Sequence, residues 1–75
     1  MIGTITIIMN DNKKSDTINE LLHSFSDNIL GRMGLPHVEG KFILTFVFKG
    51  KEDDYDNIIT GLKKIDGIKL GNLKI

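Results

Sequence analysis

The segment from Lys41 to Lys49, KFILTFVFK, constrains the fold of this chain more than any other stretch. Two lysines bracket seven residues, of which only Thr45 is polar. Successive side chains of a β-strand point to opposite faces, so four core-forming side chains would share one side. They are Phe42, Leu44, Phe46 and Phe48. The opposite side would carry Ile43, Thr45 and Val47, so we expect a central strand that is largely apolar on both faces.

The rest of the chain predicts helices and strands in the order βαββαβ. Strands are expected over residues 2–9, 29–34 and 68–75, the last with a possible bulge at Gly71. A helix is expected over residues 13–25, because Ile18, Leu21, Leu22 and Phe25 follow a helical spacing. A second helix should begin near residue 50 and end at Asp66 and Gly67. Residues 35–40, with Pro36, are predicted to form the connection of a hairpin.

This order predicts an α+β, ferredoxin-like fold, in which a four-stranded antiparallel sheet carries two helices on one face. Right-handed crossovers place the strands over residues 2–9 and 41–49 at its centre. We expect residues 1–75 to form a single domain, since two halves would each be too small to build a core.

The face of the sheet that no helix covers is the predicted oligomer face. Its residues on the two central strands are Thr4, Thr6, Ile8, Ile43, Thr45 and Val47. One interpretation is that threonine is simply a good residue for an exposed strand. The interpretation we favour is that another copy covers this face in a dimer or tetramer, because contiguous apolar patches tend to be interfaces. Small domains without disulfides often gain burial in this way.

Composition excludes several classes of function. The chain has no cysteine, which excludes disulfides, thiolate zinc sites and iron–sulfur clusters. Ten basic and ten acidic residues cancel, so direct binding of nucleic acid is not expected. The sequence shows no membrane span and no signal peptide, and we expect a cytoplasmic protein. We find no catalytic constellation and predict neither a metal nor a cofactor.

Three polar residues are candidates for an effector or interface site: His23, Arg32 and Asp27. His23 lies off the apolar stripe of its helix, and Asp27 follows four residues later. They are either solvated surface residues, part of an effector or interface site, or, least favoured, a pair of metal ligands. Arg32 is the only arginine, and strand alternation places it with Leu30 and Gly34. It either pairs with an anionic group or is a solvated edge residue that discourages sheet extension.

Residues 19–36, NELLHSFSDNILGRMGLP, resemble the signature of iron-only hydrogenase system regulators, which are small bacterial proteins. The matching positions are Glu20, Leu21, Leu22, His23, Phe25, Ser26, Ile29, Arg32, Gly34 and Pro36. The resemblance implies a fold similar to the ACT domain and to the C-terminal domain of nickel-responsive repressors. It also implies homo-oligomerisation and a regulatory role. It does not carry metal binding to this chain, which has no cysteine and only two histidines.

The leading hypothesis is therefore a homo-oligomeric regulatory module that binds a small effector at a subunit interface. The alternative is a protein-interaction or assembly domain without an effector. A third and least favoured hypothesis is a small enzyme that uses His23 and Arg32.

Overall fold

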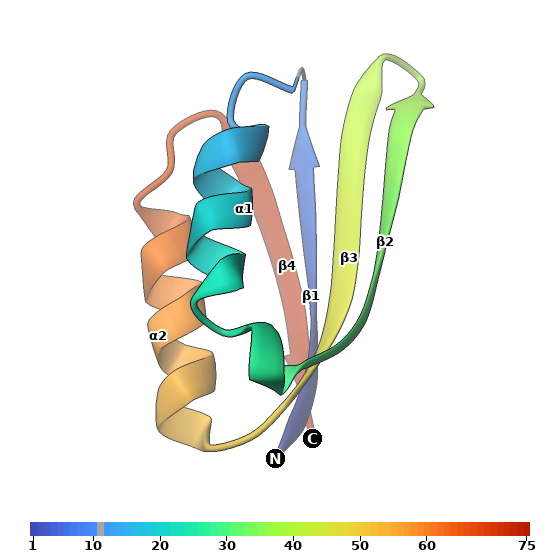
Figure 1. Ribbon diagram of the computed structural model, residues 1–75. Helices are drawn as coiled ribbons and strands as arrows, with labels where there is room; N and C mark the ends of the chain where they lie inside the picture. The colour runs from blue at the N-terminus through green and yellow to red at the C-terminus, as the bar shows by residue number, and fades with distance from the viewer. Residues whose placement is uncertain (11) are drawn as a thin grey trace.

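The predicted order of elements is confirmed by the computed structural model, which describes residues 1–10 and 12–75 (Figure 1). The elements are β1 (Ile2–Met9), α1 (Ser15–His23), a short 3-10 helix η1 (Ser26–Asn28), β2 (Ile29–Val38), β3 (Lys41–Lys49), α2 (Glu52–Lys63) and β4 (Ile68–Lys74). Within the described residues no helix combines the length and the apolar composition that a membrane span requires.

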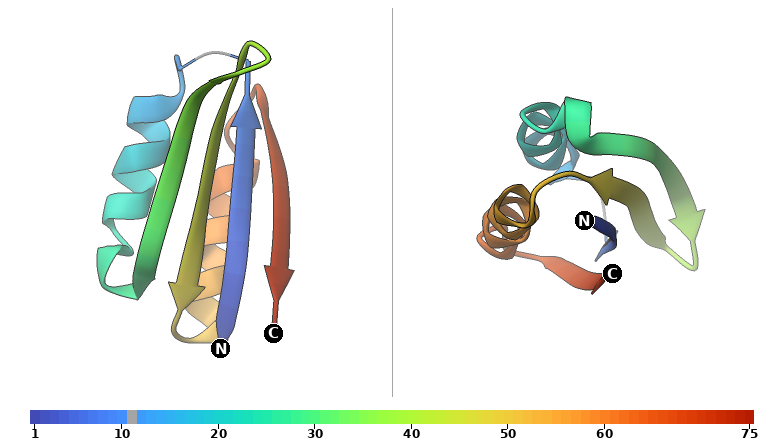
Figure 2. Two further views of the ribbon diagram at one scale, coloured as in Figure 1. Left: turned by 90° about the vertical axis from the view of Figure 1, so that its right-hand side faces the viewer. Right: turned by 90° about the horizontal axis from the view of Figure 1, so that it is seen from below.

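The four strands form one sheet in the order β2-β3-β1-β4, with every neighbouring pair antiparallel. Both helices lie on one side of it, and the other side is uncovered (Figure 2). The ferredoxin-like fold and the central place of β1 and β3 are thus confirmed. In the middle of the sheet Ile5 is paired with Phe46, and the next pair, Thr6 with Thr45, faces the opposite way.

The core lies between the sheet and the helices. Ile5, Ile7 and Phe48 on the sheet and Ile58 and Leu62 on α2 are completely buried. Side chains of this size contribute about 1.5–3 kcal/mol each when they are buried. The phenylalanine face of β3 is the core face, as predicted, and Phe42 at its end is only partly buried.

Several details differ from the prediction. Helix α2 ends at Lys63, before the predicted stop at Asp66 and Gly67. Helix α1 is shorter at both ends, and η1 follows it. Strand β2 runs on through Pro36 to Val38, so the hairpin connection is only Glu39 and Gly40, both with positive φ. Proline is tolerated there because β2 is an edge strand, and the register shifts between Leu35 and Val38. The bulge predicted at Gly71 is wrong, because β4 pairs with β1 in continuous register.

Tyr55 joins α2 to the sheet, and Gly3 makes room for its ring. The Tyr55 hydroxyl accepts a hydrogen bond from Asn72 Nδ2 at 3.0 Å and donates one to the Thr4 carbonyl at 3.4 Å. The ring meets Phe48 edge to face, with centroids 5.6 Å apart. A Cβ atom on Gly3 would lie 2.6 Å from Tyr55 Cε2 and 3.1 Å from the carbonyl oxygen of Leu73. No ordinary contact is that short, so only glycine fits beneath this ring.

A second link joins the same elements at the surface. Lys74 Nζ on β4 lies 2.8 Å from Glu52 Oε1 on α2. The hydrogen bond from Lys74 holds the pKa of Glu52 below its usual value, and it raises the pKa of Lys74. Both groups are exposed to solvent, so the pair adds little to the stability of the fold.

We predict that Gly3→Ala destabilises the protein by about 1–3 kcal/mol, the usual cost of overpacking a core. Gly71→Ala is the matched control in the same sheet, because a Cβ there meets nothing within 4 Å. Urea unfolding followed by circular dichroism measures both changes. Equal stabilities of the two variants would contradict the role given to Gly3.

Candidate functional site

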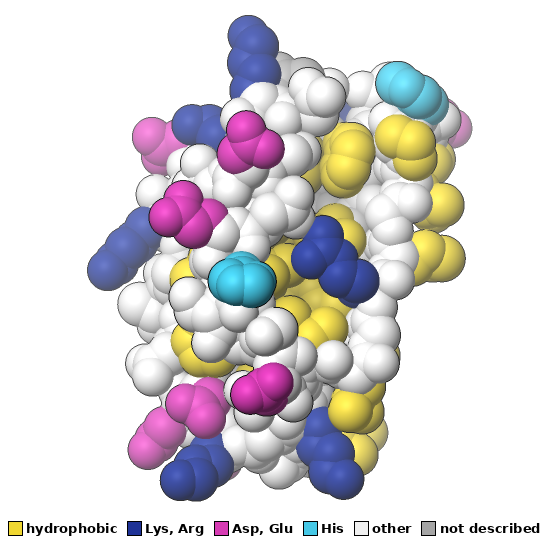
Figure 3. Space-filling model, viewed as in Figure 1, with side chains coloured by type: hydrophobic (Ala, Val, Ile, Leu, Met, Phe, Trp, Pro, Cys, Tyr) yellow, Lys and Arg dark blue, Asp and Glu magenta, His cyan; other side chains and the backbone are white. Residues whose placement is uncertain are grey.

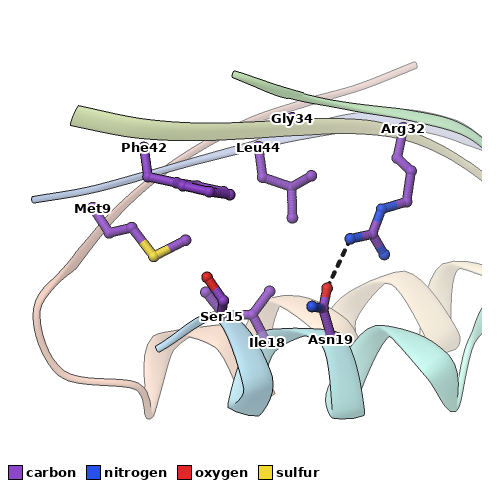
Figure 4. Close-up of a pocket in the computed structure, with 8 residues that line it drawn as sticks. All are labelled: Met9, Ser15, Ile18, Asn19, Arg32, Gly34, Phe42 and Leu44. Carbon is purple, nitrogen blue, oxygen red and sulfur yellow. Dashed lines mark hydrogen bonds between the residues drawn. The ribbon is translucent and has the colours of Figure 1, made fainter. Parts of the chain in front are cut away.

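A cleft separates α1 from the edge strand β2. At one end it forms a hollow of about 140 Å³. The residues that line this hollow are Met9, Ser15, Ile18, Asn19, Arg32, Gly34, Phe42 and Leu44 (Figure 4). Next to it lies a wider hollow of about 470 Å³, and Asn19 and Arg32 line both. Hydrophobic side chains show in the cleft in Figure 3, with a histidine and a basic side chain beside them.

Arg32 crosses the cleft from β2 to α1. Its guanidinium Nη2 donates a hydrogen bond of 2.7 Å to Asn19 Oδ1 (Figure 4). Asn19 offers a neutral amide, and among residues 1–10 and 12–75 no carboxylate forms a salt bridge with Arg32. Within the described residues, the single arginine of the chain is therefore held by a neutral amide and makes no salt bridge.

The alternation predicted around Arg32 is partly wrong. Arg32 and Gly34 do face α1 and line the cleft. A register shift between Ile29 and Gly31 interrupts the alternation of side chains just before Arg32. As a result Ile29 packs against the core, and Leu30 does not. Leu30 is 63% exposed.

Ser15, at the start of α1, contributes a hydroxyl to the narrow hollow. Its Oγ atom is buried and has no hydrogen-bond partner. A buried hydroxyl without a hydrogen-bond partner costs about 1–3 kcal/mol of stability. Neither Ser15 nor Asn19 was singled out by the sequence, because a serine and an asparagine on a helix are ordinary surface residues.

His23 and Asp27 lie in different elements and do not line a common hollow. His23 is exposed at the end of α1 and lines the wider hollow together with Arg32. Asp27 lies in η1 and lines neither hollow. Over the described residues no group of three histidine or acidic side chains is placed to hold a metal ion.

The uncovered face of the sheet is a second candidate site, which we call the open face. Its central pairs are Thr4 with Val47, Thr6 with Thr45, and Ile8 with Ile43. The Thr6 and Thr45 hydroxyls lie 3.0 Å apart, and Thr45 also donates to the Ile5 carbonyl at 3.3 Å. Because these hydroxyls already have hydrogen-bond partners within the protein, removing them from water costs little free energy.

The edge strands extend the open face. Seven large hydrophobic residues are exposed in the described part of the chain, and strand pairing places five of them on this face. Four are on the edge strands, namely Met33, Leu35 and Val38 on β2 and Leu73 on β4, and the fifth is Ile2 at the start of β1. The sequence prediction missed Leu35 and Val38 because it ended that strand at Gly34, and it left out Met33 because it named residues of the two central strands only.

Comparison with known proteins identifies the family. The family model TM1266-like, described as that of proposed iron-only hydrogenase system regulators, matches residues 1–73. The chain belongs to the TM1266-like family. This confirms the resemblance seen in residues 19–36. The search of curated proteins found no match.

Solved structures agree with the TM1266-like assignment. The structure of the uncharacterized protein TM1266 from Thermotoga maritima is 32% identical, with a TM-score of 0.84, over 96% of this chain and 92% of that one. The ACT domain from GTP pyrophosphokinase of Chlorobium tepidum is 20% identical, with a TM-score of 0.77, over 97% of each chain. The C-terminal domain of MgtC from Mycobacterium tuberculosis is 10% identical, with a TM-score of 0.72, over 96% of this chain and 84% of that one. The last two likenesses show an ACT-like fold alone.

We predict that Ser15→Ala in this TM1266-like protein increases the free energy of unfolding by about 1–2 kcal/mol, because it removes the unpartnered hydroxyl and favours the helix. Thr17→Ala, on the exposed side of α1, is the control that gains helix propensity only. Thermal and urea unfolding should rank Ser15→Ala above the control. A loss of stability would show that the Ser15 hydroxyl supports the fold.

Proposed function

We propose that this chain is a homo-oligomeric regulatory module that assembles through the open face and responds to a small effector. The observation that carries the proposal is the concentration of exposed hydrophobic residues on that one face. Family membership and the ACT-like fold support a regulatory role over catalysis.

A second copy is the occupant that best fits the open face. Its centre is made of aliphatic side chains and of the hydrogen-bonded pair Thr6 and Thr45, which resembles the apolar centre of an interface. Lys41, Lys49 and Lys69 stand at the ends of the strands on the same face. The lysines lie where a protein–protein interface usually has a polar rim around its apolar centre. Because both copies would present the same residues, the contact is self-complementary.

Strand β2 offers a physical route from an effector to assembly. Met33 is paired with Thr45 on the open face, whereas Arg32 and Gly34 line the cleft on the other side. A ligand in the cleft and a partner on the open face would therefore contact the same edge strand. Coupling between two sites requires such a shared element whose position both ligands bias.

The alternative function is an assembly domain with no effector. It would use the open face in the same way and leave the cleft empty. A third candidate, an enzyme using His23 and Arg32, finds less support, since Arg32 is bonded to an amide and the other polar groups of the hollows are hydroxyls, amides and one exposed imidazole.

We predict that Thr45→Lys weakens self-association at least tenfold and leaves the protein folded. The new ammonium would have to be desolvated at the centre of the contact. Thr60→Lys on the exposed surface of α2 adds the same charge away from the open face and should change nothing. Sedimentation velocity at micromolar concentrations measures the association of each protein. A monomeric wild-type protein, or equal effects of both variants, would overturn the proposal.

Salt is expected to strengthen self-association. Among the described residues, three lysines but only one acidic side chain, that of Glu39, lie at this face, so two copies would repel each other electrostatically. Raising the salt from about 50 to about 500 mM screens that repulsion and should tighten the dimer several-fold. The same sedimentation experiment at several salt concentrations measures the change. Weaker association at high salt would mean that ion pairs hold the copies together.

A further inference from the structure

We propose that the cleft between α1 and β2 binds a small monocarboxylate with a short apolar body, and that such a molecule is the effector. This inference rests on the proposed function and names the ligand class of its effector site. It is carried by three features of the described residues: an arginine that makes no salt bridge, linings without an aspartate or glutamate, and a small hollow with an apolar floor.

The charge at the centre of the cleft selects an anion. The Arg32 guanidinium stands where the narrow and the wide hollow meet, and its bond to Asn19 leaves most of its donors unused. A planar guanidinium matches a carboxylate with two parallel hydrogen bonds, which are stronger than its present bond to a neutral amide. A carboxylate at this point would therefore complete an arrangement that the protein has already positioned.

The linings argue against a zwitterionic amino acid. Neither hollow is lined by an aspartate or a glutamate among the described residues. An ammonium group beside Arg32 would thus lose its hydration without gaining an opposite charge. Asp16 and Glu20 are on α1 but are exposed and line neither hollow. The structure assigns the cleft to a ligand with a negative charge and no positive one.

The volume of the narrow hollow and its hydrophobic lining favour a ligand whose uncharged part is short and apolar. A volume of about 140 Å³ is close to that of an engineered cavity of about 150 Å³ that holds benzene in another protein. Ile18, Phe42 and Leu44 line it and would contact a chain of about four carbons.

Titration of the ¹⁵N,¹³C-labelled protein with sodium butyrate, followed by NMR, tests the proposal. We expect saturable shifts of the Arg32 Nε–H, the Asn19 side-chain amide and the Ile18 methyl groups, with a dissociation constant of about 1 mM or lower. The four-carbon analogues n-butylamine and 2-aminobutyrate, and inorganic phosphate, should each bind at least tenfold more weakly. Equal binding of 2-aminobutyrate, or of phosphate, would overturn the ligand class.

Two variants locate the charge that the ligand needs. Arg32→Gln should weaken butyrate binding by about tenfold or more, since it removes a charge-assisted hydrogen bond. Lys63→Gln, in the last turn of α2, removes one exposed charge outside the cleft and should not alter binding. No binding to the folded wild-type protein, or equal binding by Arg32→Gln, would overturn the proposal.

Sedimentation of the same samples separates this proposal from the proposed function. An oligomer that ignores butyrate would overturn the ligand class and leave assembly intact. A monomer that binds butyrate through Arg32 would overturn the assembly and leave the site intact.

Discussion

The antiparallel pairing of β1 with β3 is the constraint on which the rest of the structure depends. It places Ile5 beside Phe46 and Ile7 beside Leu44 toward the helices, which builds the core. Because side chains alternate, the same register sets Thr6 beside Thr45 on the other side. The buried face and the open face are thus two consequences of one pairing, and a one-residue slip would exchange them.

Strand β2 joins the two candidate sites because its side chains alternate between them. Arg32 and Gly34 face the cleft, and Met33 and Leu35 continue the open face. An edge strand bonded on one side only can shift at lower cost than β1 or β3, which are bonded on both sides. In our proposal this strand carries the response from a carboxylate in the cleft to the contact between copies.

The topology was predictable from the sequence because the strong patterns are local. The alternation over residues 41–49 and the two helical stripes determine β3, α1 and α2, and the order βαββαβ then limits the topology. The length of β2 was not predictable, since Pro36 is tolerated only when its strand lies at an edge. The requirement for Gly3 depends on Tyr55, 52 positions away in the sequence, approaching through the fold. For the same reason the sequence drew attention to Arg32 but not to its partner Asn19 or to the Ser15 hydroxyl.

The central claim is that a second copy covers the open face. An isotope-filtered NOE experiment on a mixture of ¹³C-labelled and unlabelled protein tests it directly, because it detects only contacts between copies. Our account predicts intermolecular NOEs from the methyl groups of Ile8, Ile43 and Val47, joined by Met33 and Leu35. Intermolecular NOEs confined to α1 and α2, or none in a sample concentrated enough for association, would contradict it.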